Sequence, residues 1–466
     1  MAPVDWETMT AQFTRRQALA TLGLGAAALA GGTVPSACAA FRRRPNVVLF
    51  VADDLGSVDL RCYGSKDLLT PHIDALAYSG VRFSQFYVTA PACTPSRASM
   101  LTGRHFPRVL RLGHGINPAE TTIAEMLKPA GYHTACIGKW HLGFDDGMYA
   151  DDQGFDEFFG HRTGAMDNYS HHYYWGGPDR HVMWRNKERW HEEGSYFPDL
   201  MVRESVRFIE QNKDEPFFLY MPFNIPHYPI QPDPAARERY GHIENASRRE
   251  YAALVSTLDD RVGMIMAKLE ELDLRDNTIV IFLSDHGHST EERSGGGGSA
   301  GILRGGKMTL WEGGLRVPAI ISWPAHISGR QLRPQPVTAL DLLPTLAEFC
   351  DVPLPQVEID GASLASVCAS DEASSPHDAL YWVYKEDWAV REGPWKIVGQ
   401  GDDIFLANLA LDPTETIDHA KSHRHVQNRL VDLHNRWILK LSQDANVASQ
   451  APAPHRRRAG RGRRPE

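Results

Sequence analysis

The sequence predicts an α/β protein in which helices cover both faces of a large, mostly parallel sheet. Short apolar runs alternate with helical patterns along most of the 466 residues, as they do in β-α-β units. Two of these runs, residues 46–52 and 278–283, are apolar almost throughout, which is typical of strands buried on both faces. Hydrophobic residues make up 42% of the chain and charged residues 23%, close to globular averages. This composition excludes a disordered, collagen-like or multi-spanning membrane protein.

The net charge limits the kinds of partner that the chain can bind, and the cysteine spacing limits the kinds of cross-link and metal site. The chain has 49 Lys and Arg against 58 Asp and Glu, a net charge of -9, and its main basic cluster is a short C-terminal segment. We therefore expect a small-molecule partner and no nucleic acid. The 6 cysteines lie far apart, without a Cys-x-x-Cys pair or a Cys/His zinc spacing, so neither a disulfide scaffold nor a structural zinc site is indicated. The oligomeric state is not predicted.

Residues 1–40 have the pattern of a twin-arginine export signal. Arg15-Arg16 precede a weakly apolar run that contains several glycines, and small residues follow it as a cleavage site. We expect a bacterial protein that is periplasmic or secreted, without a stable membrane span, because the run is too short to cross a bilayer. The alternatives are a surface amphipathic helix, which the glycines disfavour, and a lipid anchor on Cys38, which Pro35 disfavours.

Four predicted strands end in polar residues. The carboxyl ends of parallel strands meet at one edge of a sheet, where ligands bind. The runs and the polar residues after them are 46–52 with Asp53 and Asp54, 134–138 with Lys139 and His141, 216–222 with His227, and 278–283 with Asp285 and His286.

Helix-start signals lie between these strands. Pro71 follows Thr70 at the start of one predicted helix, which ends before Gly80, and Thr122 with Glu125 matches a capping box. A longer amphipathic helix is predicted at about residues 248–272.

Three carboxylates at the shared edge predict a bound metal. Asp53, Asp54 and Asp285 would concentrate negative charge in a dry crevice, and a hard divalent cation relieves that charge. Oxygen ligands favour calcium, or magnesium. A single Asp at this place is explained as well by capping a turn, but three on converging strands are not.

Basic residues surround the same edge and predict an anion site. Fixed cations beside a metal stabilise the charge that develops on the oxygens of a tetrahedral anion such as sulfate or phosphate. Each of them alone is explained as well by a solvated or structural role. The residues are Arg97, Lys139, His141, His227 and Lys307.

Cys93 supplies a candidate nucleophile for this site. It opens the segment Cys93-Thr94-Pro95-Ser96-Arg97, and Pro95 suits the first turn of a helix. The cysteine would then lie near the positive end of that helix, where an oxyanion is favoured. An ordinary buried cysteine is the alternative, and it leaves the surrounding sequence unexplained.

These residues resemble the type I, formylglycine-dependent sulfatase family of the alkaline phosphatase-like superfamily, with most likeness to arylsulfatases and N-acetylgalactosamine-6-sulfatases. Residues 93–104 match the signature in which the cysteine is oxidised to Cα-formylglycine, and residues 131–143 match the second family element. Asp53-Asp54, residues 284–287 and residues 305–318 add further matches, so the resemblance covers about residues 45–440.

The resemblance implies a mechanism. A hydrated formylglycine at position 93, made by a maturase, binds the metal through the hydroxyl that attacks sulfur, and His141 then deprotonates the other hydroxyl to release sulfate. Arg97 and Lys139 hold the hydrate, whereas His227 and Lys307 bind sulfate oxygens, and one of these two protonates the leaving oxygen. The implied metal ligands are Asp53, Asp54, residue 93, Asp285 and His286. His286 offers nitrogen where many members have Asn, which leaves the metal open between calcium and alternatives.

The resemblance also implies a division of the chain. A catalytic domain would span residues 45–370, and a smaller α+β domain with an antiparallel sheet would span residues 376–445. In that domain residues 380–384 and 388–398 fit strands and residues 426–441 fit a closing helix. Residues 448–466 are basic and rich in Pro and Gly, which is typical of a disordered tail.

The expected function is hydrolysis of sulfate esters, including carbohydrate sulfates. The segment 167–175 offers aromatic faces to a sugar ring, and a packed rim without a ligand is the equal alternative. Residues 294–299 are predicted to form a flexible lid or spacer. The rival enzyme is a phosphonate monoester or phosphodiester hydrolase that uses the same formylglycine site, and the rival from another class is an inactive anion-binding protein.

Overall fold

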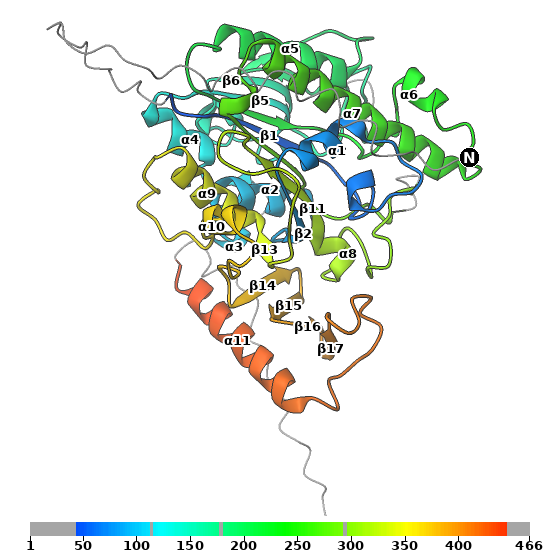
Figure 1. Cartoon of the computed structure of the whole chain (residues 1–466), viewed down its shortest axis with the longest axis vertical. Helices are drawn as coiled ribbons and strands as arrows, with labels where there is room; N and C mark the ends of the chain where they lie inside the picture. Colours follow the sequence, from blue (N-terminus) through cyan, green and yellow to red (C-terminus); the bar gives the residue numbers. More distant parts are fainter. Residues whose placement is uncertain (1–42, 112–114, 177–179, 292–295, 445–466) are drawn as a thin grey trace, which may run out of the picture. The chain divides into compact units, whose positions relative to one another are not determined.

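The computed structural model describes residues 43–111, 115–176, 180–291 and 296–444 (Figure 1). The predicted export signal, residues 1–40, and the predicted basic tail, residues 448–466, lie outside these ranges. Within them, no helix is both long and apolar enough to cross a membrane.

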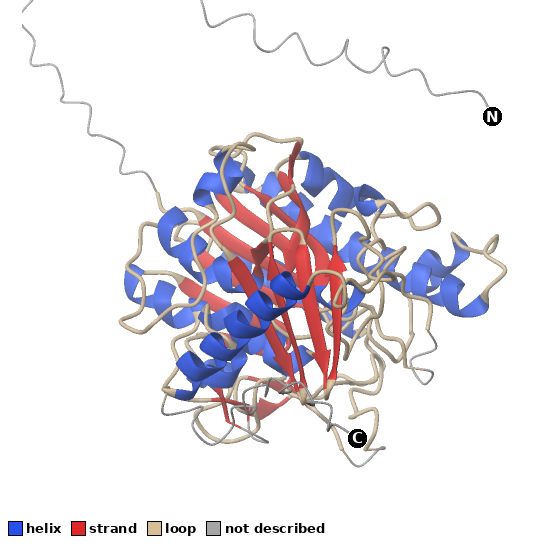
Figure 2. Cartoon of the chain, turned by 90° about the horizontal axis from the view of Figure 1, so that it is seen from below, coloured by secondary structure: helices blue, strands red, loops and turns tan. Residues whose placement is uncertain are grey.

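A large sheet forms the centre of the fold, and its inner part is parallel as predicted (Figure 2). Strand β1 (Asn46–Ala52) lies between β10 (Thr278–Ser284) and β9 (Phe217–Pro222), and both pair with it in parallel. Strands β5 (His133–Lys139) and β6 (Glu157–His161) extend the parallel part beyond β9. All four strands predicted to carry site residues are therefore present.

The edges of this sheet are mixed. Strand β11 (Arg316–Ser322) runs antiparallel between β10 and β2 (Val81–Tyr87). The short edge strands are β12 (Gln331–Arg333), β13 (Val337–Thr338), β7 (Met183–Arg185) and β8 (Glu188–Arg189), and a separate pair is formed by β3 (Leu110–Arg111) and β4 (Gly115–Ile116).

Alternate residues of β1 face two separate hydrophobic cores, which explains why the strand is apolar throughout. Helices α1 (Pro71–Tyr78), α5 (Phe197–Gln211) and α7 (Ala246–Glu271) pack in one core. Helices α2 (Cys93–Thr102), α4 (Ile123–Leu127) and α9 (Leu342–Phe349) pack in the other. The shorter helices are α3 (Phe106–Val109), α6 (Pro234–Glu238), α8 (Glu312–Leu315) and α10 (Ala365–Ala369).

The predicted helix starts agree with the structure. Thr122 and Glu125 form the complete capping box at α4, and α1 begins at Pro71. Helix α7 begins at Ala246, slightly before the predicted start, because the Asn245 side chain accepts a hydrogen bond from the Arg248 amide at 2.9 Å and caps the helix.

A four-stranded antiparallel sheet follows near the C-terminal end of the described chain, as the sequence predicts. Its strands are β14 (Ala379–Tyr384), β15 (Asp387–Glu392), β16 (Trp395–Gln400) and β17 (Asp403–Asn408), and helix α11 (Arg424–Ser442) packs on it. The apolar run 388–398 divides into two strands at Gly393, whose φ of +56° makes the turn.

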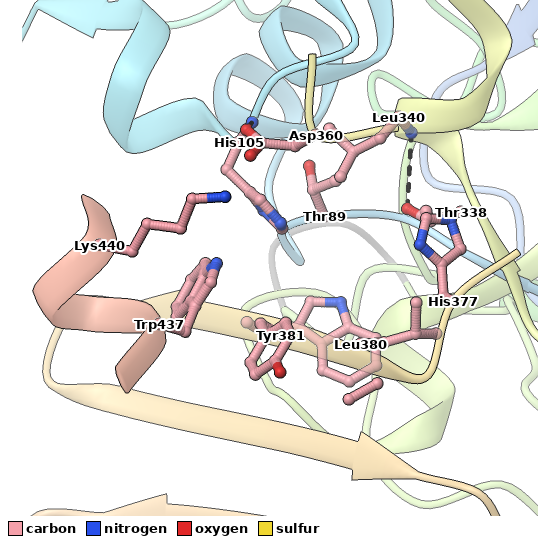
Figure 3. A pocket seen from close by; sticks show the side chains of 12 residues that line it. Thr89, His105, Thr338, Leu340, Asp360, His377, Leu380, Tyr381, Trp437 and Lys440 are labelled. Carbon is pink, nitrogen blue, oxygen red and sulfur yellow. Dashed lines mark hydrogen bonds between the residues drawn. The ribbon is translucent and has the colours of Figure 1, made fainter. Parts of the chain in front are cut away.

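Buried polar contacts join the two sheets. The Trp382 indole donates to the Val88 carbonyl at 2.7 Å, and Lys396 of β16 pairs with Glu312 of α8 at 2.9 Å. Figure 3 shows a pocket of about 180 Å³ that remains at this junction, between His105 and the Tyr381 and Trp437 side chains.

Candidate active site

The structure brings all ten predicted site residues into one cluster at the carboxyl ends of β1, β5, β9 and β10. Nine of them are buried, and His141 is partly exposed at the pocket. The ten are Asp53, Asp54, Cys93, Arg97, Lys139, His141, His227, Asp285, His286 and, from the loop before α8, Lys307.

Cys93 is the first residue of α2 and lies at the centre of this cluster. Its Sγ lies 3.2 Å from His286 Nε2, 3.6 Å from Lys139 Nζ and 3.7 Å from Asp53 Oδ1. Burial raises the pKa of the thiol, but the ammonium groups of Lys139 and Lys307 lower it more, to about 5. The position therefore favours an anionic group.

Four of the predicted metal ligands converge on one point. Donor atoms of Asp53, Asp54, Cys93 and His286 all lie within 4.8 Å of one another. The His286 Nδ1 donates to the Gly287 carbonyl at 2.9 Å, so Nε2 faces the carboxylates. Burial lowers the pKa of His286, but the negative charges of Asp285 and Cys93 raise it more, to about 9. Such a facing set of donors is stabilised by a cation between them, so the residues fit a divalent metal.

Asp285 lies at the edge of this set and also holds Arg97. Its Oδ2 accepts a hydrogen bond from Arg97 Nε at 2.9 Å and lies 2.9 Å from Arg97 Nη2 in an ion pair, while its Oδ1 lies 3.5 Å from His286 Nε2. Burial raises the pKa of Asp285 to about 6, although His286 and Arg97 lower it. Only Oδ1 of this carboxylate is directed toward the converging donors.

Two lysines neutralise the paired aspartates. Lys139 Nζ lies 2.6 Å from Asp53 Oδ2, and Lys307 Nζ lies 2.9 and 3.0 Å from the two oxygens of Asp54. Burial raises the pKa of each carboxyl, but the neighbouring cations, led by Lys139 at Asp53 and by Lys307 at Asp54, bring both below the usual value. Both aspartates are therefore ionised at neutral pH. His227 Nε2 lies 3.8 Å from Asp54 Oδ2 and completes the basic side of the cluster.

His141 is held as a neutral imidazole beside the cluster. Its backbone has a φ of +55°, and its ring packs against Gly164, where a Cβ would lie 2.9 Å from Cε1. Burial, together with the positive charges of Lys139 and Arg97, lowers the pKa of His141 well below its usual value. Its Nδ1 makes no hydrogen bond to the described residues, so the ring is available to accept a proton.

A pocket of about 450 Å³ opens above Cys93. Tyr173 and Trp175, from the predicted aromatic segment, line it together with Tyr228, and the Trp175 and Tyr228 rings lie 5.4 Å apart. No sequence motif indicated several other lining residues, among them Phe144, Arg180, Glu291 and Met308.

Tyr384 and the predicted lid segment lie where the sequence motifs alone do not indicate. Tyr384 of the C-terminal sheet donates to Met308 Sδ at 2.7 Å and so reaches the pocket rim, which no local sequence signal indicates. The predicted lid segment is anchored where it is described: Gly297 accepts from Arg248 at 2.6 Å, and the Ser299 amide donates to Asp59 at 2.7 Å.

Comparison with known proteins identifies the family of the chain. Residues 45–352 match the Sulfatase family model, and residues 306–434 match the model of the C-terminal region of N-sulphoglucosamine sulphohydrolase. Human arylsulfatase A is 36% identical over 390 residues, which cover 77% of this chain and 75% of that protein. The N-acetylgalactosamine-6-sulfatase of Sus scrofa is 34% identical over 351 residues, covering 69% of this chain and 65% of that protein.

A solved structure shares the whole architecture. The crystal structure of Ps i-CgsB in complex with k-i-k-neocarrahexaose superimposes with a TM-score of 0.78 at 31% identity, covering 88% of this chain and 95% of that one. The family model alone matches well over half of the chain. The chain therefore belongs to the sulfatase family of sulfuric ester hydrolases, with the alkaline phosphatase-like fold.

Proposed function

We propose that this protein hydrolyses sulfate esters of carbohydrates, with a formylglycine at position 93 and a divalent metal, calcium or magnesium. The observation that carries the proposal is the position of Cys93, which lines the pocket and lies among metal-type donors and the fixed cations that pair with them. A sulfate group that enters the pocket would meet both.

The metal would be held by Asp53, Asp54 and His286, with residue 93 as a further ligand and Asp285 Oδ1 beside them. Mostly oxygen donors suit a hard cation, and one imidazole nitrogen does not exclude it. When bound, the metal and the formylglycine hydrate supply an activated oxygen nucleophile with a second hydroxyl, which allows sulfate to be eliminated after the transfer.

The chain's own residues would hold the sulfate and move the protons. Lys307 and His227 face the same side of Asp54, so they are placed to bind sulfate oxygens, and one of them gives a proton to the leaving alcohol. Lys139 and Arg97 stabilise the negative charge at position 93. The neutral His141 accepts a proton when sulfate is released.

The pocket lining supports a carbohydrate as the alcohol part. Trp175 and Tyr228 present aromatic surface, and Arg180 and Glu291 add groups that hydrogen-bond to hydroxyls. Two similar proteins are named for sugars: the crystal complex carries k-i-k-neocarrahexaose, and one relative is an N-acetylgalactosamine-6-sulfatase.

Residues 1–40 are proposed to direct export to the periplasm or the medium, and a maturase of the host is proposed to convert Cys93. The catalytic and C-terminal domains are proposed to divide near residues 370–376.

Peptide mass spectrometry of the protein from its native host tests the chemistry at position 93. The tryptic fragment that contains residues 83–97 is expected to carry an aldehyde or its hydrate in place of the thiol. Active protein in which this cysteine is wholly unmodified would overturn the formylglycine proposal.

A second measurement tests the substrate class. The enzyme is expected to turn over an aryl sulfate and a sulfated sugar faster than an aryl phosphonate or a phosphodiester, and to lose activity after exhaustive chelation and regain it with Ca²⁺ or Mg²⁺. Faster turnover of the phosphonate or phosphodiester would instead identify the rival hydrolase.

A further inference from the structure

A second group of metal-type donors lies outside the active site, at the base of the pocket wall. The described residues 166–176 and 180–182 pair with one another: His172 and His181 form an antiparallel bridge, and the amide of Tyr173 donates to the Arg180 carbonyl at 2.8 Å. Tyr173 and Arg180 both line the active-site pocket. In this paired segment, His181 meets His191 and Glu193 of the segment after β8.

The donor atoms of these three residues converge. His191 Nδ1 lies 2.9 Å from Glu193 Oε1, His181 Nε2 lies 3.5 Å from the same oxygen, and all three donors lie within 4.8 Å of one another. Two ligands of one tetrahedral zinc ion, each bound at about 2.0–2.1 Å, are separated by about 3.3 Å. The 3.5 Å separation is close to this spacing, and the 2.9 Å separation is that of a hydrogen bond, which the ion would replace.

His181 supplies an independent indication of a ligand. The residue is 8% exposed, and neither of its ring nitrogens makes a hydrogen bond to the described residues. A buried imidazole without hydrogen bonds is unfavourable unless something else occupies its lone pair. The His191 ring is its neighbour, with 4.2 Å between the centroids and 27° between the ring planes.

We propose that His181, His191 and Glu193 bind a transition-metal ion of the zinc class. Two imidazoles and one carboxylate are a borderline donor set, which favours Zn²⁺ over the hard cations that suit the active site. The His191 side chain is 59% exposed and that of Glu193 46%, so the ion has an entry path and a position open to water.

The ion would join a segment that lines the active-site pocket to a segment that does not. His181 belongs to the loop that carries Tyr173 and Arg180 into the pocket, whereas His191 and Glu193 belong to the segment before α5. Binding would fix the base of this loop, because a ligand that binds only the folded arrangement stabilises it.

Other histidine–carboxylate groups serve as comparisons. The group of His72, Asp259 and Asp260 is also compact, but Asp259 already accepts from the amides of His72 and Ile73 at 3.2 and 2.8 Å. His133 pairs with Glu215 at 2.7 Å, and no third donor of the described chain joins that pair. His133→Gln is therefore a matched control.

The test titrates Zn²⁺ into the full-length, Ca²⁺-saturated enzyme by calorimetry, with Co²⁺ as a spectroscopic probe. The wild-type protein is expected to bind Zn²⁺ at this site and to give the intense visible bands of tetrahedral Co²⁺. His191→Gln and Glu193→Gln, both on the surface, are each expected to weaken this binding by at least about tenfold. His133→Gln is expected to bind as the wild type does.

Hydrogen exchange adds a readout that is independent of activity. Zn²⁺ is expected to slow exchange in residues 166–176 and 180–182 of the wild type and not of His191→Gln. The proposal is overturned if the wild type shows no Zn²⁺-dependent heat or Co²⁺ bands, or if both His191→Gln and Glu193→Gln bind as tightly as the wild type, since the ion would then lie elsewhere.

Discussion

The active-site cluster and the network around Lys396 are both built from buried ionised groups, but their carboxylates face different partners. In the network, Lys396 Nζ lies between Glu312 Oε1 and Glu415 Oε1, each at 2.9 Å, and Tyr87 donates to Glu312 at 2.7 Å. In the active site, two carboxylates, an imidazole nitrogen and a thiol face one another across less than 4.8 Å.

The difference separates a structural use of buried charge from a catalytic one. Each acid of the Lys396 network faces the same cation, so the group joins the C-terminal sheet to α8. The active-site donors converge below a pocket, where they are placed to hold the proposed cation. Burial of charge alone does not mark the site; convergence of like donors beneath an opening does.

The largest expected effect is at the centre of the active-site cluster. Cys93→Ala removes the thiol from which the proposed formylglycine nucleophile is made, so turnover of a sulfate ester is expected to fall by a factor on the order of 10⁶. The far-ultraviolet circular dichroism and the unfolding midpoint are expected to remain close to the wild type. Near-normal turnover in this variant would contradict the mechanism.

Breaking the structural network is expected to give the opposite result. Lys396→Met leaves Glu312 and Glu415 buried side by side without their cation, which is expected to lower the free energy of unfolding by about 3–5 kcal/mol. Denaturant unfolding measures the loss, and Lys421→Met, at an exposed lysine, is the control. If Lys396→Met left stability unchanged, the network would not join the two sheets as described.

Removing a cation from the active site is expected to affect catalysis more than stability. Lys307→Met leaves Asp54 without its 2.9 Å partner and the bound sulfate without a counter-charge. We expect kcat to fall by about 10²–10³-fold, the usual cost of one group that stabilises developing charge. Steady-state kinetics beside an unfolding curve distinguishes this result from the Lys396→Met result.

The same two regions show which residues could be predicted from the sequence and which could not. Residues 46–52 were recognisable as a strand because both faces of β1 are buried, and Asp53 and Asp285 were recognisable because parallel strands end at one edge. Tyr384 was not recognisable, because its place at the pocket depends on how the C-terminal sheet packs. Lys396 gave no signal either, since one lysine in a strand looks like a solvent-facing residue until Glu415 is known to reach it.

A smaller effect is expected at the aromatic wall of the pocket. Trp175→Ala removes a ring that lies 5.4 Å from Tyr228, and KM for a sulfated sugar is expected to rise roughly threefold to tenfold, since an aromatic contact contributes about 0.5–1.5 kcal/mol. Tyr78→Ala, at an exposed aromatic residue away from this pocket, is the control. An unchanged KM for the sugar would show that the wall is only a packed rim.

The smallest expected effect concerns pH. Burial, reinforced by Lys139, lowers the pKa of His161 well below its usual value, so the folded protein keeps this imidazole neutral. In the unfolded chain it takes up a proton as the pH falls below about 6.5, so its contribution to stability is lost progressively below that pH. His161→Leu is expected to flatten the dependence of the unfolding free energy on pH between about 5 and 7. If the unfolding free energy of the variant depended on pH as steeply as that of the wild type, the pH dependence would come from groups other than His161.

Because Cys93 is buried in the folded protein, a modifying enzyme can reach its side chain only before folding is complete. The residues that enclose it are spread along the chain from Asp53 to Lys307, and β10 and β11, which close the sheet beside α2, are made long after Cys93 itself. At a synthesis rate of roughly 5–20 residues per second, the more than two hundred residues between Cys93 and Lys307 take on the order of 10–40 s to appear. Until those residues are made, the charged pocket that buries the thiol in the folded chain cannot be complete.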